Sequence, residues 1–121
     1  MLRRGFLLAL CTVWLSACTH TLPLVVPLNA PLKVVVRDGP HYTLEPTDRD
    51  YQRFSKWVAN NLSGWHVYAV TAPRLGVNVD CGAWSLNFLG SGVLATTAQG
   101  TFTKRVDPSD YEYLRQPHRG P

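Results

Sequence analysis

Apolar residues follow recognisable strand and helix periods along the chain from residue 32 onward. Residues 32–37 (LKVVVR) are rich in β-branched side chains, and the turn dipeptide Asp38-Gly39 separates them from residues 41–44, which predicts a β-hairpin. Pro40 has no amide hydrogen to donate, so it weakens the second strand or confines it to the edge of a sheet.

One amphipathic helix is predicted directly after the hairpin. Its apolar stripe, with successive spacings of three, three, one and four residues, comprises Tyr51, Phe54, Trp57, Val58 and Leu62. Thr47 is placed to cap the first turn, with Asp50 three residues further on, and Ser63-Gly64 ends the pattern. The stripe would be buried against a sheet, so Trp57 is expected in the core.

The second half of the chain contains short segments separated by glycine or proline, and two of them, 77–81 and 84–88, alternate apolar and polar residues. This half predicts four or so short antiparallel strands. The segments are 65–71, 77–81, 84–88, 93–98 and 101–106. Asp107 followed by Pro108 predicts a short C-terminal helix, with Tyr111 and Leu114 on its buried side. The predicted fold class is α+β: a small antiparallel sheet with one amphipathic helix packed on a face and a short C-terminal helix.

The first 18 residues have the pattern of an export signal. Arg3 and Arg4 make the start cationic, and residues 6–14 form an apolar stretch too short to span a bilayer. The tetrapeptide Leu15-Ser16-Ala17-Cys18 resembles the lipobox of bacterial lipoproteins. This resemblance implies that residues 1–17 are removed as a lipoprotein signal peptide and that the Cys18 thiol carries diacylglycerol.

The same resemblance implies a location. Lipoproteins of Gram-negative bacteria use Asp directly after the lipidated cysteine as an inner-membrane retention mark, and Thr19 occupies that position here. We therefore expect the protein in the cell envelope, anchored to the outer membrane and facing the periplasm.

Residues 18–31 are expected to form a lipidated, proline-rich tether. Residues 19–31 contain three prolines and no charge, which favours an extended backbone. Its apolar residues, costly to leave in water, are Leu22, Leu24, Val25, Val26 and Leu28. Two interpretations remain open: the tether packs on its own domain, or it docks on a partner. Residues 32–115 then form a single α+β domain, and residues 116–121 a flexible tail.

Length, composition and charge narrow the class of protein. The chain has 121 residues, of which 45% are hydrophobic and 17% charged, as in one globular domain. The net charge of +4 includes Arg3 and Arg4, so the excess of basic residues falls to two once the signal is removed. Basic residues are also scattered along the mature chain, and nucleic acid is therefore excluded as a partner.

The sequence contains few candidates for catalytic chemistry. Cys11 would leave with the signal and Cys18 would be lipidated, so Cys81 is expected to have no partner for a disulfide within the chain. The favoured interpretation of Cys81 is a buried cysteine on a strand. The alternative is a Cys-His hydrolase that uses Cys81 with His66. Four histidines lie at spacings unlike those of metal ligands: His20, His41, His66 and His118. No cofactor motif or glycosidase-type carboxylate pair is present, so neither cofactor nor metal is expected.

These observations together favour a binding protein over an enzyme. The expected function is that of a membrane-anchored periplasmic lipoprotein acting by protein-protein contact. It would work either as an inhibitor or immunity-type protein or as an accessory subunit of an envelope assembly. The first version needs an exposed loop, for which Arg74 and Leu75 are the candidate contact residues. A small envelope enzyme using Cys81 and His66 is the alternative.

Overall fold

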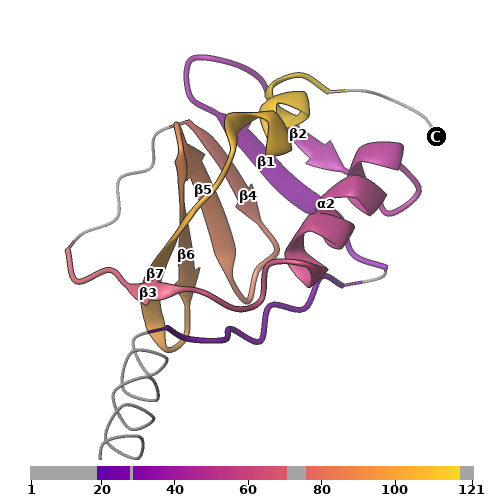
Figure 1. Cartoon of the computed structure of the whole chain (residues 1–121). Coiled ribbons are helices and arrows are strands. Elements are labelled where there is room, and N and C mark those ends of the chain that lie inside the picture. The colour runs from indigo at the N-terminus through magenta and orange to yellow at the C-terminus, as the bar shows by residue number, and fades with distance from the viewer. Residues whose placement is uncertain (1–18, 28, 71–75, 118–121) are drawn as a thin grey trace, which may run out of the picture.

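A computed structural model of the chain describes residues 19–27, 29–70 and 76–117 (Figure 1). In this part of the chain seven strands form one antiparallel sheet in the order β2-β1-β4-β5-β6-β7-β3. The strands are β1 (Leu32–Val36), β2 (His41–Leu44), β3 (His66–Val67), β4 (Val77–Asp80), β5 (Ser85–Leu89), β6 (Gly92–Thr97) and β7 (Gly100–Arg105). The α+β class is confirmed, but the sheet is larger than the small one expected.

The predicted hairpin is present and lies at one side of the sheet. Asp38 lies in the turn that connects β1 to β2 and adopts a left-handed conformation (φ 58°). Aspartate tolerates this conformation better than most residues do. β2 pairs only with β1 among the described strands, so the edge position indicated by Pro40 is confirmed.

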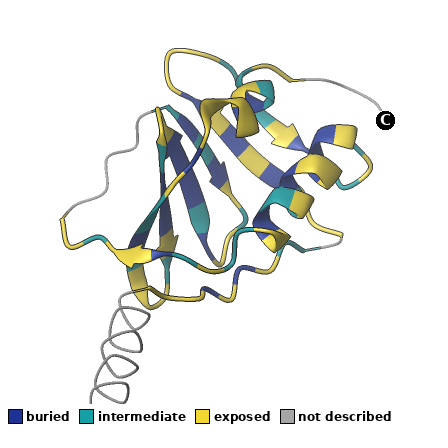
Figure 2. Ribbon diagram, in the orientation of Figure 1, coloured by how far each residue is buried: buried dark blue, intermediate teal, exposed yellow. Residues whose placement is uncertain are grey.

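Alternation along β1 and β4 places every second side chain in the core, whereas β5 and β6 each bury three consecutive residues. Figure 2 shows buried and exposed positions alternating along β1, and β4 buries Val77 and Val79 in the same way. Since Val34 pairs with Val79 and Val79 with Leu86, the buried side chains of neighbouring strands lie side by side on one face of the sheet.

The helix α2 (Arg49–Ala59) contributes Tyr51, Phe54 and Val58 to the core that the sheet residues form. It is shorter than expected: it ends at Ala59, and Leu62 lies beyond it, half-buried. The N-cap is Asp48, not Thr47, and the Asp48 carboxylate accepts a hydrogen bond from the backbone of Glu45 instead of capping the helix.

The expectation that Trp57 lies in the core is wrong in part. Trp57 is only half-buried, with its ring edge-on to Phe88 at a centroid distance of 5.3 Å. Trp65 is fully buried and donates from its indole nitrogen to the Asn61 carbonyl oxygen, and Trp84 is buried as well. The aromatic centre of the core is therefore Trp65, not Trp57.

The C-terminal segment forms two short 3-10 helices, η1 (Pro108–Asp110) and η2 (Glu112–Arg115), where one short helix was expected. The Asp107 carboxylate caps η1 by accepting from the Ser109 amide, as its position before Pro108 predicts. Tyr111 and Leu114 are buried as expected, and the Tyr111 ring stacks on Phe88 at 4.9 Å.

The expected tether packs on its own domain over the described residues. Leu22 and Leu24 are buried in the core, and the Leu22 amide donates to the Leu62 carbonyl oxygen. His20 and Trp65 form an antiparallel bridge with hydrogen bonds in both directions. The first of the two interpretations therefore describes these residues.

Within the described ranges, no helix is both long enough and apolar enough to cross a membrane.

Candidate functional site

Several residues singled out from the sequence lie outside the described residues. They are the signal peptide at 1–17, the lipid-attachment residue Cys18, the loop residues Arg74 and Leu75, and the tail residues 118–121, including His118. Gln116 and Pro117, the first two residues of the expected tail, are described and exposed.

Cys81 and His66 are not brought together. Cys81 follows β4, half-buried, whereas His66 is exposed on β3 at the far edge of the sheet. Four strand spacings separate β4 from β3, or about 19 Å measured along the sheet. The Cys81 thiol instead donates to the Trp84 carbonyl oxygen at 3.2 Å, and burial raises the pKa of the thiol, which disfavours the nucleophilic thiolate.

Histidine, cysteine and carboxylate side chains do not gather into a metal centre anywhere in the described ranges. His20 contacts the Phe102 ring, and His41 and His66 lie on opposite edges of the sheet.

The free edge of β2 presents unpaired backbone groups. The Val36 amide donates to the Pro40 carbonyl oxygen, which makes Val36 and Pro40 a hydrogen-bonded pair of the antiparallel ladder. Because such pairs alternate, Tyr42 and Leu44 direct their backbone groups at β1, whereas His41 and Thr43 direct theirs outward. No described residue pairs with that outward side of β2.

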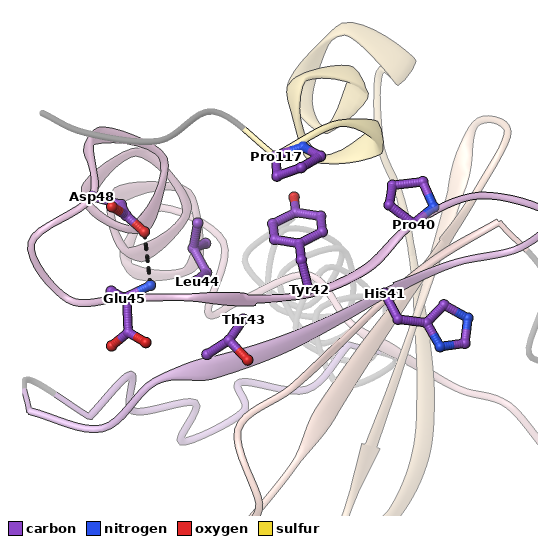
Figure 3. A pocket seen from close by; sticks show the side chains of 8 residues that line it. All are labelled: Pro40, His41, Tyr42, Thr43, Leu44, Glu45, Asp48 and Pro117. Atoms are coloured by element: carbon purple, nitrogen blue, oxygen red, sulfur yellow. Dashed lines mark hydrogen bonds between the residues drawn. The ribbon is translucent and has the colours of Figure 1, made fainter.

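A groove of about 570 Å³ runs along this free edge. Its lining comes from β2, from the turn that leads into α2 and from the C-terminal segment: Pro40, His41, Tyr42, Thr43, Leu44, Glu45, Asp48 and Pro117. Figure 3 shows the Tyr42 ring between β2 and Pro117, with the His41 and Thr43 side chains on the other side of the strand.

Tyr42 holds the wall of the groove in place. Its hydroxyl donates to the Leu114 carbonyl oxygen at 2.7 Å, so the edge strand is tied to η2 across 72 positions of sequence. Burial, with a smaller contribution from the negative charge of Asp50, raises the pKa of Tyr42 to about 12. The hydroxyl therefore stays a hydrogen-bond donor throughout the physiological range.

One end of the groove is acidic. The Glu45 amide donates to the Asp48 carboxylate at 2.9 Å, which fixes the turn between β2 and α2 and places two carboxylates beside the end of the edge strand. Figure 3 shows this hydrogen bond closing the turn. The groove thus combines backbone hydrogen-bonding groups, an aromatic wall and negative charge.

Sequence reasoning found part of this site. Pro40 indicated an edge strand, but the groove itself was missed because Pro117 was assigned to a flexible tail. The burial expected for Leu114 was the one indication in the sequence that Pro117 lies near β2, because a buried Leu114 holds the residues that follow it close to the domain.

Comparison of the chain with models of protein families, with curated proteins and with solved structures found no match.

Proposed function

We propose that this chain is a lipoprotein anchored to the outer membrane, facing the periplasm, and that it acts by protein-protein contact at the free edge of β2. The observation that carries the contact site is the groove along an edge strand whose outward backbone groups have no partner in the described structure. The anchor is supported by the lipobox resemblance that ends at Cys18.

The geometry suits a partner segment in extended conformation. Such a segment would lie beside β2 as an additional strand, exchanging hydrogen bonds with the backbone of His41 and Thr43. Each bond contributes roughly 0.5–1.5 kcal/mol, so side-chain contacts must supply the rest of the affinity. Alternate partner side chains would enter the groove beside Tyr42, and the carboxylates of Glu45 and Asp48 favour a basic residue at that end.

Both versions of the expected function can use this edge. An accessory subunit would dock on its assembly through β2. The apolar tether is not available for docking, because its residues Leu22 and Leu24 are buried in the core of its own domain. An inhibitor or immunity-type protein would place β2, or the loop with Arg74 and Leu75, against a toxic or lytic enzyme. Nothing observed in the described residues favours the alternative Cys-His enzyme.

The contact site is tested by changing the outward amide of β2. Thr43→Pro removes an amide hydrogen that faces away from β1, so the hairpin is retained while strand addition is blocked. The matched control, Thr43→Val, keeps the amide and the β propensity. Circular dichroism spectra and thermal midpoints confirm that both variants fold.

The partner is first identified by co-purification with the intact lipoprotein from detergent-solubilised outer membranes, and its affinity is then measured by titration calorimetry. We expect Thr43→Pro to weaken binding at least about tenfold, which corresponds to about 1.4 kcal/mol, and Thr43→Val to bind like the unmodified protein. Equal affinity of a folded Thr43→Pro variant, or the absence of any partner, would contradict the proposed site.

A further inference from the structure

The chain enters the fold at the edge of the sheet opposite β2. His20 and Trp65 exchange backbone hydrogen bonds at 2.7 and 3.1 Å, and Trp65 leads directly into β3. In the antiparallel register of that bridge, Thr19 lies beside His66. Figure 1 shows the indigo start of the described chain next to β3 and β7.

This pairing leaves almost no free chain between the anchor and the fold. Only Thr19 lies between Cys18 and His20, and each of the two residue-to-residue steps spans at most about 3.6 Å in an extended chain. The lipidated cysteine of the proposed function is therefore within about 7 Å of the bridged residue. A fourteen-residue tether would let the domain move freely, whereas this short connection holds the β3 edge at the membrane.

The surface at this edge carries positive charge. A hollow of about 480 Å³ is lined by Gly64, His66, Ser91, Gly92, Thr103, Lys104 and Arg105. Lys104 and Arg105 are its cations, and the lining contains no acidic side chain among the described residues. Lys104 is held in place by a hydrogen bond from its ammonium group to the Ser63 carbonyl oxygen.

Two exposed apolar side chains, Val67 and Val70, follow His66 along the chain. Val67, on β3, and Val70, three residues further on, are 61% and 64% exposed. His66 pairs with Thr103 and Val67 with Phe102, so side-chain alternation puts His66 and Arg105 on one face of the sheet, and Val67 and Lys104 on the other. The β3 edge therefore presents a cationic side chain on each face, with an exposed valine on the face of Lys104. Cationic and apolar groups combined in this way are typical of surfaces that contact the boundary between lipid headgroups and acyl chains. We call His66, Val67, Val70, Lys104 and Arg105 the anchor-proximal surface.

We propose that the anchor-proximal surface lies on the bilayer, with its basic residues against anionic phospholipid headgroups and with Val67 and Val70 at the acyl boundary. This inference rests on the lipid anchor of the proposed function. The short connection through Thr19 brings the surface to the membrane, and the charge of Lys104 and Arg105 selects anionic over zwitterionic lipid. The domain is thus held in one orientation.

The acylated mature protein, reconstituted into vesicles, tests this orientation. A fluorescent probe is attached at Val67→Cys, or for comparison at Thr43→Cys on the β2 edge, in a Cys81→Ala background with one reactive thiol. The vesicles contain phosphatidylcholine with about 30% phosphatidylglycerol, and a nitroxide-labelled lipid quenches probes near the membrane. We expect quenching at position 67 to exceed that at position 43 at least about threefold, and to fall in pure phosphatidylcholine or about 0.5 M NaCl.

A charge variant and its control complete the test. Arg105→Gln should reduce quenching at position 67, whereas Lys33→Gln, which removes an exposed cation on β1, should not. Equal quenching at positions 67 and 43 in a vesicle-bound protein would overturn the inference and leave the anchor intact. A protein with Cys18 intact that fails to associate with vesicles at all would contradict the anchor of the proposed function, and the inference would fall with it.

Discussion

At the scale of single residues, the clearest constraint is at Gly76, where the neighbouring strand leaves no room for a side chain. Gly76 has φ +78°, and a Cβ built on it would lie 2.1 Å from the Phe88 carbonyl oxygen. Its own carbonyl oxygen accepts from the Arg37 amide at 2.8 Å, so the backbone is held from two sides. This glycine directly precedes β4, and its contacts with Phe88 and Arg37 align β4 with both of its neighbours.

Gly76→Ala should therefore destabilise the domain strongly. The left-handed conformation alone costs an alanine about 1–2 kcal/mol, and the clash with Phe88 forces the backbone to move as well. Gly90→Ala is the matched control, because Gly90 has φ +58° and open space around its missing Cβ. Urea unfolding should show Gly76→Ala at least about 2 kcal/mol less stable than Gly90→Ala. Equal stabilities would show that the contact with Phe88 is not present in solution.

Cys81 provides a second residue-scale prediction. Burial raises the pKa of its thiol above the ordinary value of 9.0, although the hydrogen bond to Trp84 partly opposes this. Maleimide labelling of the folded protein should be slow at pH 7 and accelerate only above pH 9, whereas labelling in urea should be fast at neutral pH. Cys81→Ala should keep partner binding. Fast native labelling at pH 7, together with a loss of function in Cys81→Ala, would instead favour the Cys-His enzyme.

At the scale of elements, most strand positions could be predicted from sequence, but β3, expected over residues 65–71, covers only His66–Val67. Helix ends and the C-terminal packing could not be predicted. The hairpin turn at Asp38 and the alternation through Val77 and Val79 depend on neighbouring residues, and both predictions are confirmed. Trp57 fits the helical stripe equally well, yet it is half-buried. Its burial depends on where the C-terminal segment lies, and local periodicity carries no information on that.

The contact between β2 and η2 makes the free energy of unfolding decrease at alkaline pH. The folded state raises the pKa of Tyr42 to about 12 from 10.0, chiefly because the ring is partly buried. The stabilisation is thus complete below pH 10 and is lost as the pH rises toward 12, because only the unfolded chain releases the proton in that window. The pKa values of Tyr51 and Tyr113 are raised by burial as well, so all three contribute to the loss.

Tyr42→Phe should cost about 1 kcal/mol at pH 8, where only the hydrogen bond to Leu114 is lost, and less at higher pH. The free energy of unfolding of the variant should accordingly fall less steeply between pH 10 and pH 12 than that of the unmodified protein. Urea titrations at pH 8, 10 and 11 measure both slopes. Parallel slopes would mean that the Tyr42 hydroxyl is exposed to solvent in the folded protein.

At the scale of the whole molecule, the two edges of one sheet carry different proposed contacts. The proposed anchor precedes the residues that pair beside β3, and the groove lies along β2 at the other end of the strand order. Six strand spacings separate these edges, which is about 29 Å measured along the sheet. An orientation with β3 on the membrane would therefore present β2 to the periplasm, where a partner segment can reach it without competing with lipid.

This arrangement depends on Cys18 as the acylation site. Cys18→Ser should leave the precursor uncleaved, abolish labelling by a fatty-acid analogue and release the protein from the outer-membrane fraction, since a hydroxyl does not replace the thiol that receives the lipid. Cys11→Ser is the matched control. Cys11 lies in the predicted signal peptide, outside the lipobox, so this substitution should leave labelling unchanged. The fold should survive in either variant, because the described core begins after both cysteines, at Leu22. Persistent labelling of Cys18→Ser would show that another residue carries the lipid. It would contradict the anchor at Cys18 and the short connection that is proposed to hold β3 at the bilayer.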